Sequence, residues 1–180
     1  MLNNIASMLG AGGGVATDYE SIASTTLTSA QANVTFSGIS GSYSHLQIRF
    51  ISKLSAGDDV IMRFNSDSGT NYFNHILYGT GAGGGISGVP FGGAYSAVAL
   101  YYTASSASIA GGVIDILDYT STNKKKTVRF LGGYDDNGSG NIDFASGLWN
   151  ATPAAITSIT LKPVSANFAA NTSIALYGIK

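Results

Sequence analysis

Apolar and polar residues alternate along most of the chain, and the clearest example covers residues 45–79. Its first segment, HLQIRFI, places three apolar side chains on one face and two polar side chains on the other. This period of two indicates a half-buried strand. Turn residues at 55–59 and 65–69 separate it from two further segments, 60–64 and 72–78, which are rich in branched and aromatic side chains. Because the connections are short, the pattern predicts an antiparallel meander of three strands.

The same pattern predicts strands throughout the rest of the chain, and it predicts no helix longer than one or two turns. The further strands are expected at residues 19–28, 34–36, 95–103, 109–119, 124–131, 141–149, 155–162 and 172–179. About ten strands at this spacing are typical of a sandwich or barrel. The expected fold is all-β, a single jelly-roll-like antiparallel β-sandwich over residues 19–180, preceded by an N-terminal arm over residues 1–18.

The arm has an apolar pattern of its own. Leu2, Ile5, Met8 and Leu9 are spaced for one or two helical turns, and the glycine-rich residues 10–14 form a flexible joint behind them. A helix this short is not stable alone. Two interpretations stay open: a disordered terminus, or an apolar plug in which these four residues bind a partner subunit.

Composition and charge exclude several classes of protein. Only 11% of the 180 residues are charged and the net charge is −1, which leaves no electrostatic footprint for nucleic acid or an anionic membrane. The absence of cysteine excludes disulfides and thiolate metal sites and fits synthesis in a cytoplasm. The first ten residues lack the features of a signal peptide, and no apolar run approaches the length of a membrane-spanning helix.

One segment resembles a calcium-binding loop. Residues 135–143, DDNGSGNID, match its positions 1, 3, 5, 6 and 9, but position 12 is Ser146 where a bidentate glutamate belongs. The preferred interpretation is a polar hairpin turn with a glycine at positive φ. A cation site of another kind, built on Asp135 or Asp143, is the alternative.

No other residues form a convincing catalytic or cofactor site. His45 and His75 are the two histidines, and neither has a carboxylate near it in the sequence; His75, in an aromatic strand, is expected to be packed or hydrogen-bonded. Asp115 and Asp118 are three apart, so on a strand they point to opposite faces, and one of them is expected to pair with Arg129 or a neighbouring lysine. The chain is therefore not expected to be an enzyme or to hold a metal or cofactor.

The remaining candidates lie on loops. The lysine run 124–126 is expected to be a solvated or intersubunit salt-bridge patch. Residues 79–93 are expected to form a long glycine-rich surface loop, which lacks the Gly-Lys-Ser/Thr ending of a phosphate-binding loop. Tyr95, Tyr101 and Tyr102 lie near that loop and are the candidates for contact with a glycan or a partner.

Seven short segments give the chain a family resemblance. They are YESIA (19–23), YSHLQIR (43–49), MRFNSD (62–67), IDILDY (114–119), SGLW (146–149), ITSITL (156–161) and ALYGIK (175–180). Together they resemble small virion structural proteins of tailed bacteriophages, which are frequent among phages of cyanobacteria and other aquatic hosts. The resemblance runs from about Tyr19 to the end and is weakest in the glycine-rich loop.

The resemblance implies a structural component of the virion, made in the host cytoplasm. Phage decoration (cement) proteins are commonly trimers at local threefold positions, so it implies a homotrimer that binds the major capsid protein, or other virion proteins, and stabilises the capsid. The alternative is a tail-fibre or receptor-binding domain that contacts host-surface glycans. The family supplies no catalytic residues, and neither nucleic acid nor membrane is an expected partner.

Overall fold

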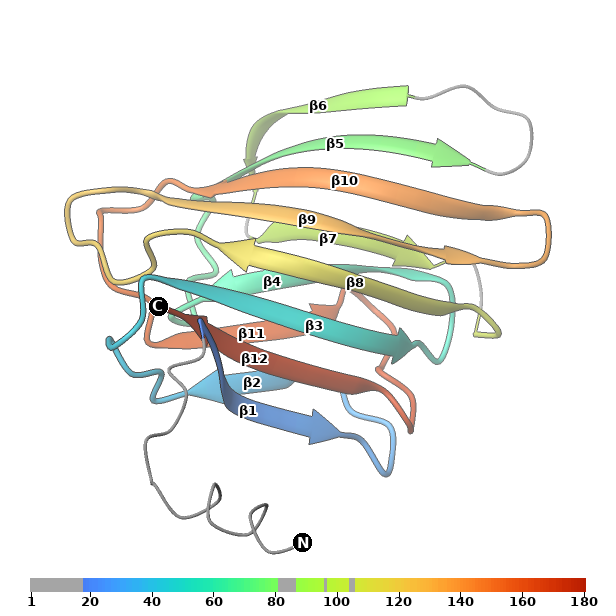
Figure 1. Cartoon of the computed structure of the whole chain (residues 1–180). Coiled ribbons are helices and arrows are strands. Elements are labelled where there is room, and N and C mark those ends of the chain that lie inside the picture. Colours follow the sequence, from blue (N-terminus) through green and yellow to red (C-terminus); the bar gives the residue numbers. More distant parts are fainter. Residues whose placement is uncertain (1–17, 81–86, 96, 104–105) are drawn as a thin grey trace, which may run out of the picture.

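The computed structural model describes residues 18–80, 87–95, 97–103 and 106–180; between residues 87 and 105 it describes the side chains of Ala97, Val98 and Leu100 alone. Within these ranges the chain forms twelve β-strands and no helix. The strands build two antiparallel sheets, and Figure 1 shows the smaller sheet lying behind the larger one. The expected all-β sandwich is confirmed, with one strand more than the eleven segments that the sequence predicts.

The larger sheet has eight strands and the smaller has four. The order of the larger sheet is β1 (Tyr19–Thr26), β12 (Ser173–Ile179), β3 (His45–Lys53), β8 (Ile109–Ile116), β9 (Lys126–Asp135), β10 (Gly140–Trp149), β5 (Tyr72–Thr80) and β6 (Ser87–Tyr95). The order of the smaller sheet is β2 (Val34–Ser37), β11 (Ser158–Pro163), β4 (Asp58–Phe64) and β7 (Val98–Thr103). Every neighbouring pair is antiparallel.

The interior lies between the two sheets and is filled by alternate residues of their strands. In β9, for example, Lys126, Val128 and Phe130 are buried while the residues between them are exposed. The rings of Phe50 and Phe130 stack with centroids 6.1 Å apart. This alternation is what a strand with one covered face requires.

The predicted three-strand meander is wrong. β3 and β5 belong to the larger sheet, β4 belongs to the smaller one, and none of the three pairs with another. The short connections after β3 and β4 carry the chain from one sheet across to the other. A short loop excludes a parallel crossover within one sheet, but it permits an arch between two packed sheets, and burial of both inner faces selects the arch.

The glycine-rich region is also more ordered than the sequence predicts. Instead of one loop over residues 79–93, β5 continues to Thr80 and β6 begins at Ser87, paired with β5. β6 is the last strand of its sheet, where Pro90 is tolerated because an edge strand leaves half of its backbone unpaired. The residues between them, 81–86, lie outside the described part of the chain.

The connection between β4 and β5 is organised around Asp67. Its carboxylate accepts hydrogen bonds of 2.7 Å from the indole N–H of Trp149, 3.0 Å from the amide of Asn71 and 2.8 Å from the backbone N–H of Gly69. Burial opposes the charge, but these donors outweigh it and lower the pKa of Asp67. The carboxylate thereby connects the turn to the side chain of Trp149. The ring centroids of Trp149 and Phe64 are 5.7 Å apart.

We expect Asp67→Ala to lower the free energy of unfolding by about 2–4 kcal/mol, because hydrogen bonds to a charged acceptor are lost and the indole N–H is left without a partner. Urea unfolding followed by tryptophan fluorescence measures the change. Asp135→Ala is the matched control, since that carboxylate accepts one backbone hydrogen bond in an exposed turn. Equal losses in the two variants would contradict this role for Asp67.

Candidate functional site

The residues that the sequence singled out for binding fall largely outside the described structure. Leu2, Ile5, Met8 and Leu9, like the rest of the arm up to residue 17, are not described. Tyr95 lies in β6, and Tyr101 and Tyr102 lie in β7. The backbone of these three tyrosines is described and their side chains are not, so their roles stay predictions.

The calcium-loop lookalike is a hairpin turn between β9 and β10. Asp136 donates its backbone N–H to the carbonyl of Ser139 at 2.7 Å, and the carboxylate of Asp135 accepts the backbone N–H of Asn137 at 2.7 Å. Asn137 and Gly138 have φ of 56° and 102°, as a tight hairpin requires. The preferred interpretation is therefore confirmed, and among described residues no three His, Asp or Glu side chains gather as metal ligands would.

The last acidic residue of that motif has a different environment. Asp143 points into the sandwich and is 4% exposed. Its Oδ1 accepts a hydrogen bond of 2.6 Å from the amide of Asn141, while its Oδ2 and the Oδ1 of Asn141 are buried without partners. Burial, reinforced by the charge of Asp59, raises the pKa of Asp143 to about 6. This is an energetically costly position for a carboxylate, and in the sequence only the alternation that turns Asp143 inward indicates it.

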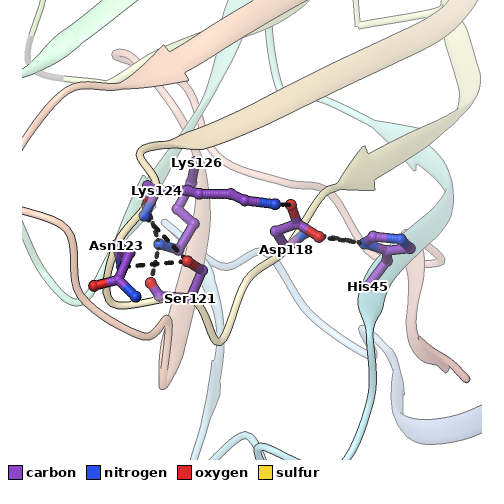
Figure 2. Close-up of polar contacts among 6 residues, drawn as sticks. All are labelled: His45, Asp118, Ser121, Asn123, Lys124 and Lys126. Atoms are coloured by element: carbon purple, nitrogen blue, oxygen red, sulfur yellow. Dashed lines mark hydrogen bonds and ion pairs between the residues drawn. The ribbon is translucent and has the colours of Figure 1, made fainter.

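A cluster of polar side chains surrounds the connection between β8 and β9 (Figure 2). The Nδ1 atom of His45 accepts a hydrogen bond of 2.9 Å from the backbone N–H of Asp118. The Asp118 carboxylate accepts one of 2.7 Å from Lys124, which lowers the pKa of that carboxyl. The hydroxyl of Ser121 accepts the backbone N–H groups of Asn123 and Lys124. These contacts bind the connection to itself and to β3, and no base is aligned on a hydroxyl nucleophile in them.

The lysine run does not form one solvated patch. Lys126 is fully buried, and its ammonium donates to the backbone carbonyls of Ser121 and Lys124. Burial lowers the pKa of Lys126. The expectation of a solvated patch is wrong for Lys126, because Lys126 is the first residue of β9 and lies on the same inward face as Val128 and Phe130.

The face of the larger sheet that points away from the smaller sheet, here called the outer face, carries a different set of side chains. The guanidinium of Arg49 lies between the rings of Tyr19 and Tyr177, 5.3 and 5.0 Å from their centroids. Beside it, Arg129 pairs with Asp115 at 3.5 Å, as the sequence predicted. His75, expected to be packed or hydrogen-bonded, is exposed on this face.

Most exposed large apolar side chains of the described residues also lie on the outer face. The seven are Tyr19, Ile51, Leu77, Ile109, Leu131, Ile142 and Phe144, each 45–62% exposed. Strand pairing places Leu131 opposite Phe144, and Phe144 opposite Leu77. The half-buried Val113 lies on the other side of Leu131, so an apolar row crosses four neighbouring strands.

The outer face is hollowed beside this row. A depression of about 230 Å³ is lined by Val113, Asp115, Arg129, Phe130, Leu131 and Phe144. Four of the six lining residues are apolar, and the Asp115–Arg129 ion pair supplies the polar groups. The arrangement can hold an apolar side chain, or a ligand that combines an apolar face with hydroxyl groups.

Sequence reasoning missed the outer face as a site. A signal was present, because residues 109–116 are apolar at positions that point to both faces of the sheet, as in strands covered on both sides. Which neighbours complete the apolar row depends on strand order, which the pattern does not contain.

Comparison with models of protein families, with curated proteins and with solved structures finds no match. In the described part of the chain there is also no helix of the length and hydrophobicity that membrane spanning demands.

We expect Asp143→Asn to stabilise the protein at pH 7.5 by about 1–3 kcal/mol, since it removes a buried carboxylate whose pKa is raised to about 6. Below pH about 4 the wild-type carboxyl is protonated in both the folded and unfolded states, so no charge penalty exists. Above pH about 6 it is ionised in both, and the penalty is complete. Urea unfolding of both proteins at several pH values measures the difference.

The stabilisation should therefore fade as the pH drops from 6 to 4. Asp135→Asn, in the exposed hairpin turn, is the control and should show no such trend. A difference between wild type and Asp143→Asn that stays constant over this range would show that the buried carboxylate carries no penalty.

Proposed function

We propose that this protein is a structural component of a phage virion, most specifically a capsid decoration protein that binds the particle surface as an oligomer and stabilises it. The observation that carries the proposal is the outer face, where seven exposed apolar side chains gather on one side of a rigid sheet. Apolar patches of this kind mark interaction surfaces with other proteins. The resemblance to small virion proteins of tailed phages supplies the kinds of partner: further copies of this chain, the major capsid protein or another virion protein.

The strand pairing supports a jelly roll. Without β5, β6, β9 and β10, eight strands remain, and they pair first with last, second with seventh, third with sixth and fourth with fifth: β1–β12, β2–β11, β3–β8 and β4–β7. This nested pairing is that of a hairpin wrapped into two sheets, with two hairpins inserted at one side of the larger sheet. Jelly rolls are frequent in viral capsid and lectin domains, which fits the proposed role.

The polar clusters of the described residues are compatible with a structural role. His45, Asp118 and Lys124 hold one connection, and Asp67 holds another. The arm remains the proposed anchor, with Leu2, Ile5, Met8 and Leu9 as its contacts.

A tail-fibre or receptor-binding role is the second candidate, favoured by the depression on the outer face. Sugars stack on aromatic rings and hydrogen-bond to planar polar side chains, and Phe144, Asp115 and Arg129 offer such groups around one depression. Tyr95, Tyr101 and Tyr102 remain candidate contacts for the same ligand class.

The decoration role predicts hundreds of copies in each particle, and an arm that is needed for attachment. Quantitative mass spectrometry of purified virions measures the copy number. We expect purified full-length protein to bind particles that lack it, and Ile5→Lys with Met8→Lys to weaken binding at least tenfold, because charges replace apolar contacts. Val164→Lys, a change of the same kind at an exposed position outside the arm, should bind normally. A handful of copies, or unchanged binding by the arm variant, would contradict the decoration role.

The receptor-binding role predicts glycan binding that depends on the depression. On an array of host-surface glycans, Phe144→Ala should reduce binding about tenfold or more through loss of the stacked ring, whereas Val164→Ala should not. Absence of binding by the wild-type protein would exclude this candidate.

A further inference from the structure

The outer face requires a cover that the described chain does not provide. The smaller sheet packs on the opposite side, and its four strands bury the inner positions of the larger sheet. Nothing among the described residues lies over Leu131, Ile142 and Phe144, which are 54%, 62% and 51% exposed. Contiguous apolar patches are usually covered by a partner in the assembled protein.

The face is large enough for a stable protein contact. Eight strands spaced about 4.8 Å apart, with about eight residues each at about 3.3 Å, give a sheet face of roughly 1,000 Å². A standard interface buries roughly 800 Å² on each partner. A second sheet can pack on such a face at about 10 Å, as the sheets of a sandwich do.

Two cationic groups of the outer face, Arg49 and Arg129, have partners within it, and a third, Lys53 at the end of β3, is exposed. Asp115 pairs with Arg129, and Arg49 lies between Tyr19 and Tyr177 while its Nε donates to Gln47 at 2.8 Å. Gln47 in turn donates to Asp115 at 2.8 Å. Partners of this kind reduce the like-charge repulsion when the middle of the face meets an identical face.

The distribution of apolar residues decides between kinds of self-association. A ring, such as a trimer, needs two different complementary patches on each copy, whereas a twofold dimer needs one patch that binds its own equivalent. Outside the outer face, Val164 is the one exposed large apolar side chain of the described residues. Seven of the eight exposed large apolar side chains of the described residues thus lie on one face, so a contact that buries them in two copies joins outer face to outer face, as a twofold contact does.

We infer that two copies of this chain pair through their outer faces, around the row formed by Val113, Leu131, Phe144 and Leu77. This inference deepens the proposed function by naming the partner of the outer face, and it rests on that function only for its place in the virion. It replaces the trimer implied by the resemblance with a dimer, whose depressions beside Phe144 face the apolar side chains of the other copy.

Light scattering coupled to size exclusion, over about 1–100 µM protein, tests the pairing. We expect the wild type to have twice the chain mass of 18.4 kDa. Ile142→Lys and Leu131→Lys should each weaken the dimer at least about 100-fold, since a twofold contact holds every substitution twice and buries both ammonium groups. Both positions are more than half exposed in the single chain, so both variants should keep the wild-type circular dichroism and melting temperature.

Two matched variants separate this contact from others. Val164→Lys places the same charge outside the outer face and should remain dimeric. Ile5→Lys in the full chain should also remain dimeric; dissociation of that variant would show that the arm, not a second outer face, covers the patch. A monomeric or trimeric wild type, or a dimer that survives both outer-face variants, would overturn the inference.

The oligomeric state is measured without particles, so the pairing and the decoration role can fail separately. A monomer that binds particles in high copy number would overturn the pairing and leave the decoration role intact. A dimer that has no affinity for particles would support the pairing and contradict the decoration role.

Discussion

Burial of one face of an eight-stranded sheet against a four-stranded sheet is the constraint on which the rest of the structure depends. Every strand sends alternate side chains into the space between the sheets, whatever those side chains are. Most are apolar, but the same rule turns Lys126 and Asp143 inward. Lys126 reaches two backbone carbonyls, whereas Asp143 finds one amide and keeps an unpartnered oxygen. The two charges show how far the alternation overrides the preference of each residue.

The division of consecutive strands between the two sheets also explains the paths of the connections. Strands that follow one another in sequence alternate between the sheets at the start of the fold, so β3, β4 and β5 are joined by short arches. The turn after β4 is held by Asp67 through Trp149 of β10, a contact between elements far apart in the sequence. The inserted pairs β5–β6 and β9–β10 extend only the larger sheet (Figure 1), and they bring Leu77, Ile142 and Phe144 to its outer face.

The polar side chains and the apolar side chains of the described surface thus have different roles. Polar groups such as His45, Asp118 and Lys124 hold connections in place. Apolar groups gather on the outer face, where seven of them are 45–62% exposed. Strand pairing holds the apolar row in one backbone arrangement, which lowers the entropic cost of any contact that the row makes.

The sequence by itself determined the local properties of this protein: strands with one apolar face, polar turns and a hairpin at Asp135–Gly140. These follow from neighbours along the chain, because a period of two and a turn residue act over a few positions. Tertiary structure alone decided which strands pair, that the expected meander is a set of arches, that Lys126 is buried, and that seven apolar residues share one exposed face. Those features join residues far apart in the sequence. They are selected by the free energy gained when two whole sheet faces are buried, and a local sequence pattern does not show which strands form those faces.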